Sequence, residues 1–472
     1  MPDKPRHPKG LYVLFFTEMW ERFGFYTMLF IFTLYLDEYF HFPHPGTIYG
    51  AYLAFVYFTP IAGGIVADRL LGFRKTIVLG ALLLSLGYGM LATRIPDSPD
   101  NEAKVAAAER QHAQNLLDWQ ARSTAAKAAG QPFQEPQPRY EGPGRTSGRP
   151  LLFLALVVLI LGNGLFKPNI SVMVGNLYEE GNPLKESAFN IFYMGINIGA
   201  FFAPLAAASL RSTLGWSWAF GAACAGMLIS LVIFQGFKRF VAHAEIGRHE
   251  RSVVQGPELT KSQEWSRIGA LLVIYAIVVL FWMAFHQNGF TLTFWARDCT
   301  GPLFGRQIPP ETFGAANAFF VVTLTPLVVW FWSMMRRRSL EASTPGKMGL
   351  GMLLTGTAFG IMGLAGLLGG DFGRVSPYWL IAAYCVVTLG ELNLSPMGLA
   401  FCSKVAPPRF RGMMMGLWFG ATACGNYLSG AVEPLWDKWP HSRFFFFLVA
   451  TSILAALLLR LVLKKVNQAV SS

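Results

Sequence analysis

Long apolar runs separated by short polar loops dominate this chain. A helix needs about 20 apolar residues to cross the hydrocarbon core of a bilayer, and runs of this length recur along the whole sequence. The pattern predicts twelve membrane-spanning helices, at 11–36, 48–67, 75–94, 151–173, 186–208, 216–237, 266–296, 312–334, 348–369, 376–402, 410–431 and 443–463. We therefore predict an all-α polytopic membrane protein with two six-helix halves.

The spans and the segments between them divide the chain into four parts. We expect an N-terminal six-helix bundle (1–96 and 151–237), an extracytoplasmic insertion (97–150), a cytoplasmic interdomain loop (238–265) and a C-terminal six-helix bundle (266–472). In the insertion, the Ala-rich stretch 102–129 can form an amphipathic helix, whereas the Pro- and Gly-rich stretch after it cannot. Because loops tolerate insertions, we interpret this segment as a tolerated surface feature.

Prolines recur at matching places in the two halves. Thr59-Pro60 in the second span corresponds to Thr325-Pro326 in the eighth, and Pro168 in the fourth corresponds to Pro396 in the tenth. Interrupted helices in corresponding positions of two repeats are typical of transporters that bind substrate between the repeats. Coincidence stays open as the alternative, because membrane helices tolerate proline.

The distribution of Lys and Arg predicts the orientation of the chain. Short cytoplasmic loops of membrane proteins are rich in these residues. The termini and the even-numbered loops hold 23 of them, whereas the odd-numbered loops other than 97–150 hold 7. We expect a multi-pass protein of the plasma membrane, in a bacterium the inner membrane, with both termini in the cytoplasm and with lipid around its spans.

Composition narrows the functional class. With 53% hydrophobic and 14% charged residues, the chain is neither an ordinary soluble enzyme nor a disordered protein. The net charge of +12 follows from the loop cations and forms no basic stripe with interleaved aromatic residues, so we expect no nucleic-acid partner. The five cysteines show neither metal-ligand spacing nor a disulfide framework, and we expect no metal site.

Away from the ends of the predicted spans, five positions hold Asp, Glu, Lys or Arg: Glu18, Glu21, Arg22, Lys167 and Glu391. Each costs about 2.5–3.5 kcal/mol on insertion scales, so we expect them to serve a function. The offsets from Glu18 to Glu21 and Arg22 place all three on one helical face, where Glu18 and Arg22 can pair. Glu391 has no evident charged partner in its own half.

This set suggests a coupling mechanism. Protonation of Glu18 or Glu21 would weaken its hold on Arg22 or Lys167 and free a cation for an anionic group of a substrate. A proton and a substrate would then be coupled through one exchange of ion pairs. The alternative is a structural cluster of ion pairs that only fixes the register of the helices.

Five motifs, in order along the spans, resemble those of the proton-dependent oligopeptide transporter (POT, or PTR) family within the major facilitator superfamily. The resemblance covers essentially the whole chain except 97–150. The motifs are EMWERFGFY at 18–26 with Phe25 in place of a usual Tyr, the loop GGIVADRLLGFRK at 63–75, GLFKPN at 164–169, FYMGINIG at 192–199 and GELNLSP at 390–396.

The resemblance implies a proton-coupled symporter that imports di- and tripeptides or peptide-like molecules by alternating access, as a monomer and without a cofactor. It implies that Glu18, Glu21, Arg22 and Lys167 couple proton movement to binding. Lys167 would lie near the peptide carboxylate, and Glu391 with Asn317 near the amino terminus. Other positions that match the family's pocket are Tyr26, Tyr57, Tyr193, Asn197, Trp282, Ser395 and Trp418. Without the resemblance, Tyr57 and Trp418 are better explained as packing residues.

The chain departs from the family at two positions. Where the family usually has an Arg on the first span this chain has Leu29, and where it usually has an acid on the seventh span this chain has His286. In the family these two residues can pair as an outer gate and help to bind the substrate carboxylate. Leu29 follows Tyr26 by three residues, so we expect it to face the same cavity. For His286, a titrating gate residue and a packed neutral residue both stay open.

These departures leave two rivals to peptide symport. The first keeps the fold but carries a non-peptide anion or an amino-acid derivative. The second is a non-transporting receptor or scaffold. We do not expect an enzyme, because His286 is the one histidine inside a predicted span and the chain has neither a GxSxG elbow beside a base nor a Walker-type loop.

Overall fold

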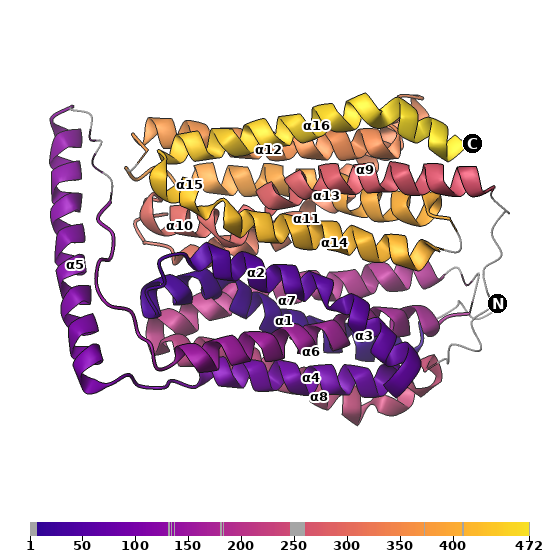
Figure 1. Ribbon diagram of the computed structural model, residues 1–472, viewed down its shortest axis with the longest axis horizontal. Coiled ribbons are helices and arrows are strands. Elements are labelled where there is room, and N and C mark those ends of the chain that lie inside the picture. The colour runs from indigo at the N-terminus through magenta and orange to yellow at the C-terminus, as the bar shows by residue number, and fades with distance from the viewer. Residues whose placement is uncertain are drawn as a thin grey trace. The chain divides into compact units, whose positions relative to one another are not determined.

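The computed structural model describes residues 7–130, 133, 135, 137–179, 182, 184–245, 260–371, 373–407 and 410–471. In these residues the chain is helical and has no β-strand (Figure 1). Most of the predicted interdomain loop, 246–259, lies outside the described residues. The remainder of that loop contains two short 3₁₀ helices, Lys238–Phe240 and Ala242–Ala244, and the first turn of the next helix.

The chain folds as two compact units that each combine distant parts of the sequence. The first unit contains 1–31, 52–94 and 150–256, and the second contains 32–51, 95–149 and 257–472. The outer parts of the first two spans and the whole insertion therefore group with the C-terminal half of the chain.

The first unit is a bundle of apolar helices. Its main packing joins α4 to α8 and α7 to α8. The helices are the first part of α1 (Lys9–Leu34), the last part of α2 (Pro45–Phe58), α3 (Pro60–Val66), which continues as a π-helical turn (Ala67–Leu71), α4 (Phe73–Ala92), α6 (Arg149–Asn176), α7 (Leu184–Leu214) and α8 (Trp216–Gly236).

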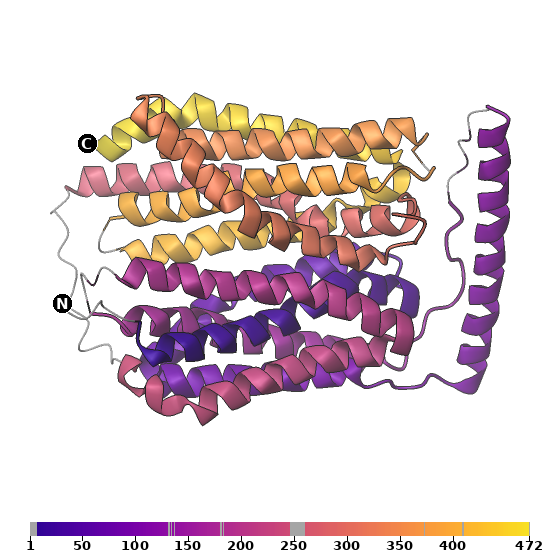
Figure 2. The ribbon, with the colours of Figure 1, turned by 180° about the vertical axis from the view of Figure 1, so that it is seen from behind.

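The second unit is a larger bundle in which α12 packs along both α13 and α16, and α14 along α9. Figure 2 shows these helices from behind. Its helices are α5 (Pro99–Ala128), α9 (Lys261–Phe285), α10 (Thr291–Asp298), α11 (Gly314–Arg337), α12 (Thr344–Leu368), α13 (Tyr378–Val405), α14 (Arg411–Ala431), α15 (Glu433–Lys438) and α16 (His441–Ser471).

A helix occupies each of the twelve predicted positions. In the described residues, ten helical stretches are long and apolar enough to cross a membrane. The other two positions are held by α1, of 26 residues, and α14, of 21 residues. α1 carries Glu18, Glu21 and Arg22 near its middle, which lowers its apolar character without shortening it.

Two expectations about continuity need correction. Of the matched prolines, Pro60 alone begins a new helix, whereas α6, α11 and α13 continue through Pro168, Pro326 and Pro396. In a membrane helix, neighbouring helices and hydroxyl side chains satisfy the carbonyl that such a proline frees. Proline therefore marks an interruption less reliably here than expected.

The seventh span, predicted as one helix over 266–296, is broken instead. α9 ends at Phe285, residues His286–Gly289 form a 3₁₀ helix, and α10 starts at Thr291. A Cβ on Gly289 would lie 1.9 Å from the hydroxyl of Tyr49, so glycine leaves room for this tyrosine. The carbonyl oxygens at the break are satisfied, because Tyr384 donates to Asn288 at 3.1 Å and Thr33 to Gly289 at 3.1 Å.

The insertion contains the expected amphipathic helix. α5 covers Pro99–Ala128, close to the predicted 102–129, and an extended segment then returns toward α6. Figures 1 and 2 both show α5 beyond the ends of α12 and α16, running across their direction. The insertion is therefore a separate layer at one end of the second unit.

Candidate functional site

Helix α1 buries its three predicted charges in one cluster of the first unit. Glu18, Glu21 and Arg22 are at most 3% exposed. The guanidinium of Arg22 donates two hydrogen bonds to Glu21, one of them 2.7 Å long, and its Nε lies 3.3 Å from Oε1 of Glu18. Arg22 is thus paired with both acids. The second oxygen of Glu18 is buried and accepts no hydrogen bond from the described residues.

Asn163 of α6 extends this cluster, and the sequence did not single it out. Nη2 of Arg22 lies 3.5 Å from Oδ1 of Asn163, whose amide donates to the carbonyl of Val56 at 3.0 Å. Asn163 precedes Lys167 by four residues and so lies on the same face of α6. An amide inside the apolar run 151–173 was the signal that could have identified it.

Among the described residues, Lys167 contacts an aromatic ring and is not paired with either acid. In the described part of the chain it forms no ion pair, and its Nζ lies 4.6 Å from the centre of the Tyr57 ring. A cation over an aromatic face is held by the ring quadrupole. Lys167 is therefore a cation that can accept an anionic partner without first leaving a carboxylate. Tyr57 is the residue that holds it.

Helix α7 closes on α1 beside the cluster. A Cβ on Gly199 would lie 2.3 Å from the carbonyl of Met19 and 3.1 Å from Cβ of Arg22, so the glycine of the motif at 192–199 permits this contact. Asn197 is buried and donates to the carbonyl of Tyr193 at 2.9 Å. The side chain of Tyr193 is half-exposed.

The first span also places the remaining candidates of this unit. Tyr26 is partly buried and stacks on Phe30 with ring centres 6.0 Å apart. Leu29, where the family usually has Arg, is 7% exposed. The first unit thus combines Glu18, Glu21, Arg22, Tyr26, Leu29, Tyr57, Lys167, Tyr193 and Asn197.

In the second unit, Glu391 is held by neutral groups. The amide of Asn317 on α11 donates to its carboxylate at 3.1 Å and to the hydroxyl of Thr388 at 3.0 Å. The expected proximity of Glu391 and Asn317 is therefore present. Two residues further along α13, Asn393 accepts a 2.8 Å hydrogen bond from the indole of Trp332. Ser395 follows on the same helix and is partly exposed.

Two tryptophans of the second unit are buried and pack against glycines of neighbouring helices. Trp418 is 2% exposed, and its ring occupies the space that a side chain at position 398 would need. Trp282 is 7% exposed and packs against Gly425, while its buried Nε1 has no hydrogen-bond acceptor among the described residues.

His286 lies at the break after α9, where it stacks on Trp282 with ring centres 5.4 Å apart and meets the edge of Phe285 at the same distance. It is 7% exposed. This environment supports the packed interpretation of His286. Trp282, His286, Asn317, Glu391, Ser395 and Trp418 all belong to the second unit.

The described residues contain no group of three His, Cys, Asp or Glu side chains that could hold a metal ion. The contacts described at the two sites are ion pairs, hydrogen bonds and a cation over an aromatic ring. In the first unit, Glu18, Glu21, Arg22 and Lys167 carry no net charge together, and Lys167 forms no ion pair with any described residue. In the second unit a single carboxylate is solvated by an amide.

Comparisons with known proteins agree with this architecture. Residues 74–255 and 241–447 match the POT family model. The peptide transporter YePEPT of Yersinia enterocolitica subsp. palearctica is 30% identical, with 90% of this chain and 87% of that protein covered. A di-/tripeptide transporter of Lactococcus lactis subsp. cremoris is 28% identical, with 97% and 95% covered.

A solved structure is similar over nearly the whole chain. It is a peptide transporter POT with one substitution, in complex with alafosfalin, and it has a TM-score of 0.81 at 26% identity, covering 99% of this chain and 97% of that one. The family match, the 30% identity and this fold lead to one conclusion: the chain is a membrane transporter of the POT family, within the major facilitator superfamily.

Proposed function

We propose that this protein is a proton-coupled symporter that imports di- and tripeptides or peptide-like molecules by alternating access. One observation carries the proposal: Lys167 is a cation within a span that forms no ion pair with the described residues, and Glu391 is a carboxylate within a span that accepts a hydrogen bond from the neutral amide of Asn317. A peptide at neutral pH has a carboxylate for the first and an ammonium group for the second. Relatives named as peptide transporters support the same substrate class.

Proton coupling is assigned to the cluster on α1. Arg22 is shared between Glu18 and Glu21. When one carboxylate takes up a proton, its attraction for Arg22 falls and the guanidinium pairs with the other acid alone. The change in local positive charge then favours an anionic group at Lys167. Protonation and binding of the peptide carboxylate are thereby linked in one site.

The setting of the transporter completes the proposal. We propose that it acts as a monomer in the plasma membrane, in a bacterium the inner membrane, with both termini in the cytoplasm, and that the proton gradient alone supplies the driving force, without a cofactor. The excess of Lys and Arg in the even-numbered loops supports this orientation.

The test is uptake by proteoliposomes under an imposed inward proton gradient. Labelled dialanine is the substrate, and di- and tripeptides, amino acids and non-peptide anions are the competitors. We expect gradient-dependent accumulation that peptides inhibit. Accumulation that ignores the gradient would overturn symport, and a lack of competition by every peptide would overturn the substrate class.

A second candidate function changes only the cargo. Leu29 is an apolar, buried residue where the family usually has a cation, and His286 is packed against Trp282 where the family usually has an acid. The site then offers one cation fewer for a carboxylate. A non-peptide anion or an amino-acid derivative suits such a site, and inhibition by these compounds but not by peptides would favour this candidate.

A further inference from the structure

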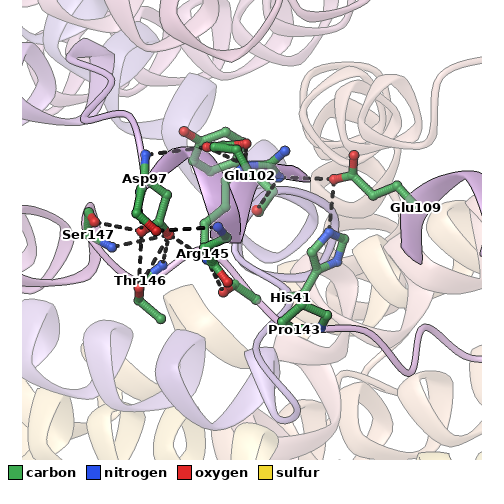
Figure 3. A network of polar contacts seen from close by, with 12 residues as sticks. His41, Asp97, Glu102, Glu109, Pro143, Arg145, Thr146 and Ser147 are labelled. Atoms are coloured by element: carbon green, nitrogen blue, oxygen red, sulfur yellow. Dashed lines mark hydrogen bonds and ion pairs between the residues drawn. The ribbon is translucent and has the colours of Figure 1, made fainter. Parts of the chain in front are cut away.

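The insertion 97–150 is closed at its base by one carboxylate. Asp97 accepts hydrogen bonds from the backbone N–H of Thr146 at 2.5 Å, from the hydroxyl of Ser147 at 2.6 Å and from the amide of Asn101 at 2.9 Å (Figure 3). The bonds from Ser147 and Thr146 hold the pKa of Asp97 well below its usual range. The two ends of the insertion are therefore tied together.

Beyond Asp97, the insertion also binds the turn that follows the first span. Arg145 donates to the carbonyl of Tyr39 at 2.9 Å and to Glu109 at 3.0 Å, and it also pairs with Glu102 at 3.3 Å. Its side chain is 12% exposed. Charge-assisted bonds of this kind are about twice as strong as neutral ones. Figure 3 shows Arg145 between the two glutamates.

His41 adds a second contact at the same place. Its Nε2 lies 3.1 Å from Oε1 of Glu109, and its ring stacks on Tyr140 with centres 3.7 Å apart. Glu109 comes from α5 and Tyr140 from the returning segment. Both arms of the insertion therefore hold the residues that follow α1.

The other end of the insertion reaches the C-terminal half of the sequence. Arg139 donates to the carbonyl of Asp437 on α15 and lies 3.1 Å from its carboxylate. Trp119 and Phe133 meet edge to face, and together with the turn after α12 they line a cavity of about 610 Å³. The insertion therefore contacts two parts of the chain that are distant in sequence, the segment after α1 and the C-terminal helices.

The segments that the insertion bridges also touch each other. On α10, Arg297 pairs with Asp37 at 2.6 Å. The carboxylate of Glu433 accepts from the backbone N–H groups of Gly46 and Thr47, at 3.0 and 2.9 Å, at the start of α2. We define these contacts between residues 32–51 and the C-terminal helices as the outer contacts. Their side of the protein, which carries the insertion, is the one predicted to be extracytoplasmic.

We propose that the insertion is a strap that holds the outer contacts together and slows the opening of the transporter to the outside. The inference rests on the proposed function, because alternating access requires residues 32–51 to part from α10, α14 and α15. The strap binds both sides of that separation, through Arg145 to Tyr39 and through Arg139 to Asp437. The anchors at Arg145 and Arg139 are hydrogen bonds and ion pairs, so they can release and re-form in water.

A buried threonine supplies the reporter for a test. Thr33 is 0% exposed, and its hydroxyl donates to Gly289 across the outer contacts. In Thr33→Cys, a membrane-impermeant maleimide added from outside reacts with this thiol when the outer contacts part. The labelling rate of the parent chain, which has only the five native cysteines, is measured separately and subtracted as background. The assay needs no substrate, so it stands apart from the uptake test.

Arg145→Ala in the reporter chain should raise the labelling rate about tenfold, because it removes three partners of a largely buried guanidinium. Arg139→Ala should raise it about twofold, since this pair is more exposed. Arg139 is a surface residue, so its loss leaves the fold intact. The matched control is Arg122→Ala, which breaks an exposed pair with Glu135 inside the insertion itself.

The control should label at the parental rate. Labelling of both Arg145→Ala and Arg139→Ala at the rate of Arg122→Ala would overturn the strap. Faster labelling of the two anchor variants together with failed peptide uptake would support the strap and overturn the proposed substrate instead. The two proposals therefore fail by different measurements.

Discussion

The two units treat their intramembrane carboxylates in opposite ways. In the first unit, Glu18 and Glu21 share the guanidinium of Arg22, and Lys167 lies nearby over Tyr57. In the second unit, Glu391 receives one hydrogen bond from the neutral amide of Asn317. A carboxylate that is already paired can exchange partners, whereas one held by a dipole still lacks a compensating charge. The first arrangement suits coupling, and the second suits capture of a cation.

Removing Lys167 from the first unit should have the largest effect on this difference between the units. Lys167→Ala should lower proton-driven accumulation by about two orders of magnitude, because the carboxylate of a bound peptide would then lack the cation that pairs with it. Uptake into proteoliposomes measures the effect. Lys404→Ala makes the same change at an exposed end of α13 and should behave as the parent. Unchanged accumulation in Lys167→Ala would refute its role in coupling.

The second unit is tested by Glu391→Gln, which keeps the shape of the side chain and removes its charge. We expect the KM for unmodified dipeptides to rise about tenfold or more. The KM for peptides with an acetylated amino terminus should not change, since these lack the ammonium group. Glu264→Gln, in the first turn of α9, is the control. Equal losses for both peptide classes would contradict a role in binding the ammonium group.

A third carboxylate, outside the spans, extends the comparison. Burial raises the pKa of Glu433 to about 7, although the N–H groups of Gly46 and Thr47 favour its charged form. An exposed Glu titrates near about 4.3. The closed outer contacts therefore bind this proton more tightly than an open form, and they lose stability as the pH rises from about 4.3 to 7.

In the Thr33→Cys reporter, this predicts faster labelling at pH 8 than at pH 5. Glu433→Gln should lack this dependence, and the ratio of the two chains cancels the pH dependence of the reagent. We expect the ratio of parent to variant to rise by between one and two orders of magnitude over this range. A constant ratio would show that Glu433 does not titrate with the opening. Asp437, whose pKa burial also raises, lies on the same short helix.

The smallest effect sharpens the comparison at the two departures. Leu29→Arg with His286→Glu restores the pair usual in the family, one residue in each unit. If the missing pair sets selectivity, the double variant should prefer unmodified dipeptides over non-peptide anions about threefold more than the parent. Competition for uptake measures the ranking, and each single substitution is the control. An unchanged ranking would show that the pair does not set selectivity.

Local spacing predicted much of the first site and little of the contacts between distant segments. The offset of four between Glu18 and Arg22 predicted their pairing, and the long apolar runs predicted the helices. The same reasoning did not reveal that Arg22 reaches Asn163, because that contact joins residues 141 positions apart. Tertiary packing selects such partners, and the sequence pattern carries no direct trace of it.

The break after α9 shows a second limit. The run 266–296 is apolar throughout its first part, and apolar periodicity alone does not distinguish one helix from two. The polar group Gln287-Asn288-Gly289 was the available signal, and its meaning depends on Tyr49 and Tyr384 approaching from elsewhere. The anchors of the insertion were missed for the same reason, since they join Arg145 to Tyr39 and Arg139 to Asp437.

The outer contacts include a meeting of glycines, and this has a kinetic consequence. A Cβ on Gly430 of α14 would lie 2.2 Å from the carbonyl of Gly46, and one on Gly50 would lie 2.8 Å from that of Asn426. Backbone thus touches backbone, with no side chain between that can rotate out of the way. Rotamer changes take picoseconds to nanoseconds, but rigid displacement of whole helices takes microseconds to milliseconds. The rate at which whole helices move as rigid bodies, and not the rate of side-chain rotation, therefore limits the turnover of this transporter.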